Sequence, residues 1–144
     1  QSIGEYFQGA FAAVGINVEL INQEWNTFLE TRKNGDYSVA RNGWIADYND
    51  SYTFLEQYDS ATNGNNDTGW ENPEYTKLLT QSKTETDPAK RLELLLQAEE
   101  IFMAELPVAP IYYYTNLYVK QDYVQNMEPD VLGNINLKDV DITK

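Results

Sequence analysis

Residues 16–44 switch between two kinds of apolar spacing, and this switch constrains the fold more than any other feature of the chain. Apolar and polar residues alternate over 16–20, which indicates a strand with one buried face. Asn22 then precedes the spacing of one helix face, which Gly35 ends, and alternation returns over 37–44. The residues on that helix face are Trp25, Phe28, Leu29 and Arg32. We therefore predict a β-α-β unit with parallel strands and a right-handed crossover.

Three more helices are predicted from apolar spacing and end signals. Residues 3–14 form the first, which Gly15 ends. An Asn-Pro pair at 72–73 and an Asp-Pro pair at 87–88 each place a capping residue before a proline at the first helical position. Pro107 stops the last helix. The buried faces are predicted to contain Tyr75, Leu78, Leu79 and Ser82 in one helix and Leu94, Leu95, Ala98, Ile101 and Phe102 in the other.

The C-terminal part of the chain is rich in β-forming residues. Residues 108–114 and 117–119 read as β segments, and a short strand is expected within 135–142. Together with the helices, they predict an α/β fold. Its core is expected to be built from Leu78, Leu94, Leu95, Ile101, Phe102 and Ile111.

Composition excludes several classes of function. The 144 residues suit one domain, and 10 basic against 23 acidic residues give a net charge of −13. That charge argues against nucleic-acid partners and anionic membrane surfaces. The absence of His and Cys excludes His-based triads, thiol nucleophiles, disulfides and the usual zinc ligands. No apolar run approaches the roughly 20 residues of a membrane span, and a start at Gln1 without a leader leads us to expect a piece of a longer protein.

Asp47 lies in an apolar and aromatic run, where a carboxylate is normally disfavoured. A carboxylate buried there without a partner costs several kcal/mol. Arg41, Arg32 or a cationic group of a ligand could supply the partner. The alternative to a ligand partner is an internal salt bridge at the end of a strand.

Residues 59–70 place Asp59, Asn63, Asn65 and Asp67 at spacings that suggest a calcium loop. Ala61 occupies a ligand position, however, and Trp70 stands where a bidentate Glu is required. We therefore expect an ordinary polar loop and no metal site.

Paired carboxylates could also indicate glycoside hydrolysis. Asp47 with Asp50 is the best pair, but neither belongs to a motif that specifies an acid and a nucleophile. An acid-pair hydrolase is therefore a minor alternative.

A ligand site can be assembled from five residues: Trp25, Arg32, Arg41, Trp44 and Asp47. A carboxylate for an ammonium group, arginines for a carboxylate and flat indoles for side chains suit a zwitterionic peptide or amino acid. The alternative is that both tryptophans belong to the core and the charges form a buried ion pair.

The segment NQEWNTFLETRKNGDYSVARNGWIADYND at 22–50 resembles the signature region of the oligopeptide-binding proteins of ABC importers. The resemblance continues through NPEYTKLL at 72–79, through 87–116 and into the LGNINLKDV tail. It covers essentially the whole chain, and the ordered run of NQEW, GWIADYND and PIYYYTN is highly specific.

The resemblance implies a fragment of the C-terminal lobe of a two-lobe, type II periplasmic-binding-protein-like fold. Residues 1–115 would be part of the peptide-binding lobe, and 116–144 would return to the first lobe. The fragment alone is expected to fold, to bind peptide poorly and to self-associate.

The resemblance also implies residue roles. Asp47, in the GW-x-ADY motif, would hold the α-amino group of a peptide, and Trp25 and Trp44 would line side-chain pockets. Arg32 and Arg41 would supply positive charge. Two further ligand-binding positions are Ile45, through its backbone, and Tyr114, near the hinge. Ser51-Tyr52 stands where relatives usually have proline, so this loop departs from the family pattern.

As a function, the resemblance implies binding of oligopeptides outside the cell and delivery to the membrane permease of an ABC importer. It implies no enzyme activity, no cofactor and no metal. The location would be extracytoplasmic, as a cell-surface lipoprotein or in the periplasm. A receptor for signalling peptides or a surface adhesion protein on the same fold remains an alternative.

Overall fold

The computed structural model describes residues 2–143, which divide into two compact units, unit 1 over 2–38 and unit 2 over 39–143. Unit 1 contains α1 (Ser2–Ala13) and α2 (Trp25–Asn34). Both helices were predicted and are confirmed. The cap of α2 differs from the prediction, because Glu24 rather than Asn22 accepts hydrogen bonds from the backbone of Asn26 and Thr27, over 2.9 and 3.2 Å. Gly35 ends α2 in the left-handed region at φ 71°, where glycine avoids a steric cost.

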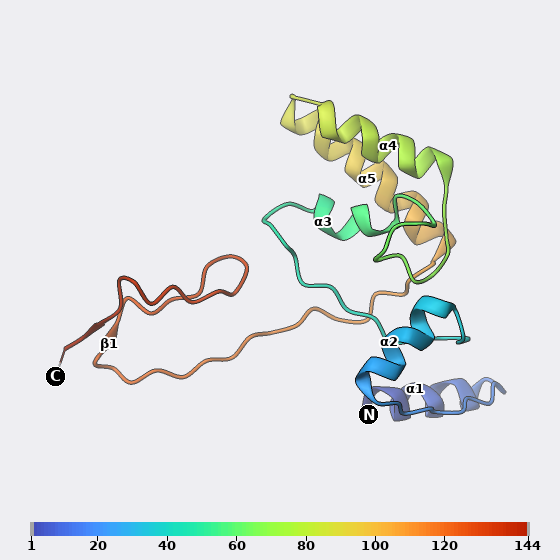
Figure 1. The fold of residues 1–144 in the computed structure, drawn as a ribbon, viewed down its shortest axis with the longest axis horizontal. Coiled ribbons are helices and arrows are strands. Elements are labelled where there is room, and N and C mark those ends of the chain that lie inside the picture. The colour runs from blue at the N-terminus through green and yellow to red at the C-terminus, as the bar shows by residue number, and fades with distance from the viewer. Residues whose placement is uncertain (1, 144) are drawn as a thin grey trace. The chain divides into compact units, whose positions relative to one another are not determined.

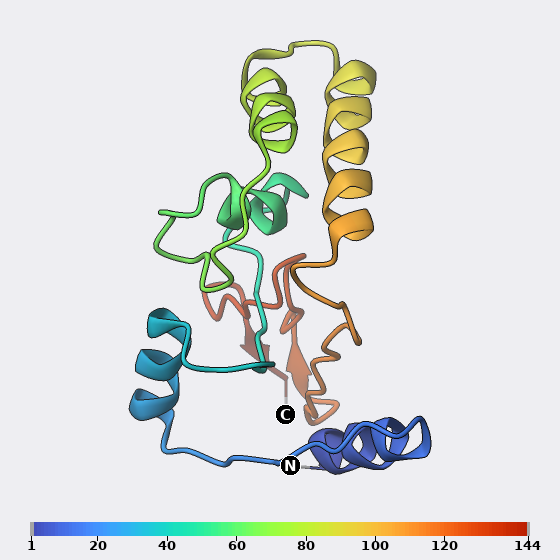
Figure 2. The ribbon, with the colours of Figure 1, turned by 90° about the vertical axis from the view of Figure 1, so that its right-hand side faces the viewer.

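Unit 2 contains four helical elements followed by a small sheet. These are α3 (Tyr52–Leu55), the 3-10 helix η1 (Glu56–Tyr58), α4 (Pro73–Thr84), α5 (Pro88–Glu105), β1 (Val124–Gln125) and β2 (Asp141–Ile142). α4 and α5 lie side by side, with α3 packed at their flank (Figures 1 and 2).

The starts of α4 and α5 follow directly from their sequences. The Asn72 side chain accepts from the backbone of Glu74 and Tyr75, and Asp87 accepts in the same way at the start of α5. Each cap precedes a proline at the first helical position. α5 ends at Glu105, and the capping residue Leu106 takes a left-handed conformation (φ 49°) directly before Pro107.

The core of unit 2 lies between α3, η1, α4 and α5. Every residue of the predicted α4 face is buried, as are Leu95, Ala98 and Phe102 of α5. Leu94 and Ile101 are partly buried against this core, whereas Ile111 is 56 % exposed and was wrongly assigned to it. Aromatic rings extend the core, since Trp70 packs edge-on against Tyr75 and Phe102 at 5.0 and 5.4 Å between ring centroids. Tyr52 of α3 and Tyr58 of η1 complete the buried apolar core.

The predicted β-α-β unit is wrong. Within residues 2–143, strands occur only as β1 and β2, which pair antiparallel with Val124 opposite Ile142. Residues 16–20, 37–44 and 108–119 are irregular, and Val39 is 90 % exposed. A strand exists only where a neighbouring backbone completes its hydrogen-bond ladder. The alternation of apolar and polar residues therefore identified segments suited to a sheet, but it did not show whether a neighbouring strand is present to pair with them.

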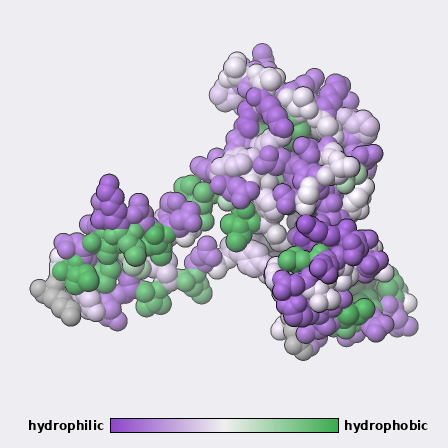
Figure 3. All heavy atoms as spheres, viewed as in Figure 1, coloured by the Kyte–Doolittle hydropathy of each residue, from purple (hydrophilic) through white to green (hydrophobic). Residues whose placement is uncertain are grey.

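None of the helices in the described range is both long and apolar enough to cross a membrane. Hydrophobic residues are exposed in the C-terminal part of the chain (Figure 3). Leu117, Val119 and the aromatic Tyr113 are each more than 90 % exposed.

Candidate functional site

The segment 41–53 of unit 2 is organised around the side chain of Thr53, which is fully buried in α3. The Trp44 indole Nε1–H donates to Thr53 Oγ1 over 3.3 Å. The backbone N–H of Asp47 donates to the same oxygen over 3.2 Å. A hydroxyl has two acceptor lone pairs, so one side chain holds two separate points of this segment.

The Asp47 carboxylate is exposed and takes part in no hydrogen bond or ion pair within residues 39–143. The proposed internal bridge to Arg41 is therefore not formed. Arg41 instead donates from its guanidinium to the Tyr114 hydroxyl over 2.7 Å. Trp44 is half-buried beside Asp47, and the Ile45 side chain is 75 % exposed.

Tyr114 connects residues 110–116 to the segment that carries Arg41. A Cβ built on Gly43 would lie 3.5 Å from the Tyr114 hydroxyl, so the two segments are in close contact. The Tyr112 ring packs edge-on against Tyr114 at 5.1 Å between centroids. Hydrogen bonds with Tyr112 and from Arg41 lower the pKa of the Tyr114 hydroxyl, because both stabilise its ionised form. Arg41, Gly43 and Tyr114 thus form one cluster.

Asp50 has a structural partner that the sequence did not reveal. Arg91 of α5 donates to Asp50 Oδ2 from Nη1 over 2.8 Å and to Asp50 Oδ1 from Nη2 over 3.0 Å. The backbone of Tyr52 also donates to Asp50. The hydrogen bonds from Arg91 hold the pKa of the Asp50 carboxyl below its ordinary value. A general acid needs a raised pKa, so Asp50 is poorly suited to acid-pair hydrolysis.

Trp25 and Arg32 lie on α2 in unit 1. The Trp25 ring packs against Phe28 at 5.9 Å between centroids, and the Arg32 guanidinium lies 5.6 Å from the centre of the Phe28 ring. Trp25 is 55 % exposed and therefore does not belong to a deep core. The predicted helix face is thus confirmed as a row of stacked side chains within unit 1. The five other predicted site residues lie in unit 2.

Two other polar regions use their side chains internally. In the 59–70 loop, the Asn63 amide donates to Asp59 Oδ1 over 3.0 Å and to the Glu56 carbonyl over 2.9 Å. Buried Asn66 joins the two ends of the loop by donating to the carbonyls of Ser60 and Trp70. No group of three acidic, His or Cys side chains within residues 2–143 is placed to hold a metal ion. The prediction that this loop binds no metal stays a prediction.

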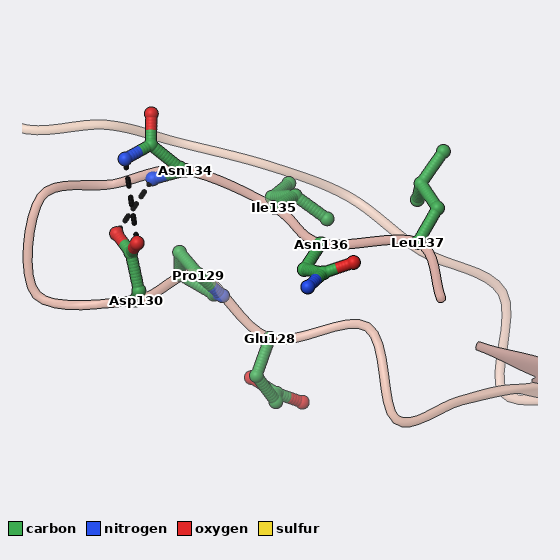
Figure 4. Close-up of a pocket in the computed structure, with 7 residues that line it drawn as sticks. All are labelled: Glu128, Pro129, Asp130, Asn134, Ile135, Asn136 and Leu137. Carbon is green, nitrogen blue, oxygen red and sulfur yellow. Dashed lines mark hydrogen bonds between the residues drawn. The ribbon is translucent and has the colours of Figure 1, made fainter. Parts of the chain in front are cut away.

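An open hollow lies in the C-terminal segment (Figure 4), lined by Glu128, Pro129, Asp130, Asn134, Ile135, Asn136 and Leu137. Of its two carboxylates, Asp130 accepts from the backbone of Leu132 and from the backbone and side chain of Asn134, and Glu128 accepts from Tyr118 and Lys120. The backbone hydrogen bond from Asn134 contributes most to lowering the pKa of Asp130. The Asp130 side chain thus stabilises the turn that forms one side of the hollow.

Sequence reasoning missed Thr53, Arg91 and Tyr112. Asp50 carries a signal for a helix start, because a short polar side chain before an apolar turn is typical of one. No local pattern joins Asp50 to Arg91, which is 41 residues away along the chain.

Comparison with known proteins defines the class. Residues 1–66 match the family described as bacterial extracellular solute-binding proteins, family 5, middle region. The oligopeptide-binding protein OppA of Bacillus subtilis is 51 % identical over 114 residues, which are 79 % of this chain and 21 % of that protein.

Two solved structures extend the similarity to nearly all of the chain. OppA of Haemophilus influenzae, in complex with the peptide RPPGFSPFR, is 34 % identical with a TM-score of 0.79, covering 97 % of this chain and 27 % of that one. A dipeptide-binding protein of Pseudoalteromonas in complex with Met-Leu is 27 % identical with a TM-score of 0.83, covering 99 % and 29 %.

The chain has the fold of part of a two-lobe extracellular solute-binding protein. Its sequence places it with the family 5 extracellular solute-binding proteins. It spans about a fifth of the length of the curated relatives it matches.

Proposed function

We propose that this chain carries the amino-terminus anchor of an extracytoplasmic oligopeptide-binding protein that delivers peptides to an ABC importer. One observation carries the proposal. The Asp47 carboxylate is exposed and has no cationic partner within residues 39–143, while its own backbone is held by Thr53 beside the Trp44 indole. A carboxylate on a held backbone next to a flat ring suits a ligand ammonium group.

The other residues take roles that fit this anchor. Trp44 and Trp25 are proposed as walls of side-chain pockets, and Ile45 contributes its backbone. Arg41, oriented by its hydrogen bond to Tyr114, and Arg32, stacked near Phe28, supply positive charge for peptide carboxylates. Tyr114 itself is proposed to face the peptide.

Such a site supports binding of many sequences. Affinity must then come from the peptide main chain and termini, since side chains vary. A charge-assisted hydrogen bond to the amino terminus contributes about 1.5–3 kcal/mol in a closed groove. The irregular segments 37–44 and 108–114 offer backbone groups for pairing with an extended peptide.

The complete protein is proposed to be a binding protein without enzyme activity. Residues 1–115 would form part of the peptide-binding lobe, and 116–144 would return to the other lobe. Its partners would be an oligopeptide and the permease subunits of an importer, and it would be held in the periplasm or on the cell surface by a lipid anchor. The relatives named above are binding proteins, two of them solved with peptides.

Mass spectrometry of ligands that co-purify with the complete protein tests this function. Short peptides of mixed sequence with free amino termini are expected. A uniform non-peptide ligand, or peptide cleavage on incubation, would contradict it. A single defined peptide, with no importer genes beside the coding gene, would favour a signalling-peptide receptor.

A further inference from the structure

We propose that Thr53 is a positioning residue that fixes both the amino-terminus anchor and the neighbouring pocket wall through one buried hydroxyl; this inference rests on the proposed function. Thr53 is inaccessible to solvent, so it cannot touch a ligand held outside α3. Its effect on a peptide must pass through the groups that it holds.

Those groups are the two that the proposed function requires. The indole N–H of Trp44 and the backbone N–H of Asp47 both donate to Thr53 Oγ1, over 3.3 and 3.2 Å. These donors are three residues apart in an irregular segment, with no strand or helix to fix them. The shared acceptor therefore sets the spacing between the indole and the backbone of the anchor.

Thr53 is itself held by the core. Its backbone N–H donates to the Asp50 carbonyl over 3.3 Å, and the Asp50 carboxylate is clamped by Arg91 of α5. The neighbouring Tyr52 is buried in the core cluster. A rigid support of this kind allows a site on an irregular segment to keep one geometry.

The test compares Thr53→Val, which keeps the shape and removes the hydroxyl, with Thr53→Ser, which keeps the hydroxyl. Both are made in the complete protein and measured by calorimetry with a tripeptide and with its N-acetylated form. The dissociation constant of the acetylated peptide divided by that of the free peptide reports the contribution of the anchor alone. Thr53→Val is expected to reduce this ratio about tenfold, the effect of losing roughly one to two hydrogen bonds, and Thr53→Ser is expected to restore most of it.

Thr76→Val is the matched control. The Thr76 hydroxyl donates to the Asp59 carbonyl over 2.6 Å, away from the site. Its loss should lower the melting temperature and leave the ratio unchanged. In the wild-type protein, the indole N–H resonance of Trp44, assigned by its disappearance in Trp44→Phe, should shift in Thr53→Val and not in Thr76→Val.

The inference is overturned if Thr53→Val weakens both peptides equally, or if the Trp44 resonance does not move. If Thr53→Val does not fold, Thr53→Ser and Thr53→Ala decide, since only the alanine variant should lose the ratio. If the wild-type protein does not distinguish the two peptides, the proposed function fails first. If Asp47→Asn abolishes the ratio and Thr53→Val leaves it intact, only the positioning role fails.

Discussion

The Asp50–Arg91 bridge should stabilise unit 2 measurably, and Arg91→Met is the variant that tests it. The change removes two hydrogen bonds to Asp50 and one from Arg91 Nε to the Ser82 carbonyl, 3.2 Å long. Both side chains are about 30 % exposed. Charge-assisted hydrogen bonds contribute about 1.5–3 kcal/mol when buried, and exposed ion pairs only about 0–1 kcal/mol. We expect the free energy of unfolding to fall by about 1–3 kcal/mol.

Urea unfolding of the 144-residue chain, followed by circular dichroism, measures this loss. Lys77→Met is the matched control, because the Lys77–Glu74 pair has both side chains more than half exposed. It should cost less than about 0.5 kcal/mol. An effect of Arg91→Met no larger than that of the control would refute the reasoning.

The pH dependence has a definite sign. The pKa of Asp50 is lowered from 3.8 in the folded protein, so its folded state binds fewer protons than the unfolded state. The stabilisation is therefore complete above about pH 4–5 and is lost as the pH falls through the folded pKa. The difference between wild type and Arg91→Met should shrink below pH 4. A constant difference from pH 7 to pH 3 would mean that packing of the arginine stem, not the charge pair, stabilises the protein.

Three further outcomes are expected. Trp25→Ala should change the preference of the complete protein for large side chains while it stays folded, because Trp25 is 55 % exposed; unfolding without a change in preference would assign Trp25 to the core. Millimolar calcium should leave the melting temperature unchanged, whereas a rise of several degrees would reveal a site in the 59–70 loop. The 144-residue chain should bind short peptides more weakly than micromolar and self-associate through exposed residues such as Tyr113 and Leu117. Tight binding by a monomeric chain, seen by calorimetry and light scattering, would contradict this.

The helices were predictable because their signals are local. Asn72, Asp87 and Gly35 act within one turn of the helix end that they define, and all three do so as predicted. Of the predicted strands, only the short one within 135–142 is present, as β2. The others were not predictable in the same way as the helices, because a ladder needs a second backbone whose position no local pattern encodes. The same limit explains Ile111, whose apolar character predicted burial but whose segment has no covering layer in unit 2.

The candidate site shows the same division. The unusual setting of Asp47 between Trp44 and Tyr48 was visible in the sequence, and so was the placement of Trp25, Phe28 and Arg32 on one face of α2. The hydrogen-bond partners of Arg41 and Asp50 were not visible in the sequence. Arg41 is bonded to Tyr114 rather than to Asp47, and Asp50 is bonded to an arginine 41 residues away. Contacts between distant segments depend on the packing of the whole unit, which spacing alone does not determine.

The most direct test of the account is calorimetry on Asp47→Asn in the complete protein, with a tripeptide and its N-acetylated form. The substitution keeps the size of the side chain and removes its charge. The free tripeptide should bind about 10- to 100-fold more weakly, as the loss of about 1.5–3 kcal/mol requires, while binding of the acetylated form should change little. An unchanged dissociation constant for the free tripeptide would show that Asp47 is not the anchor.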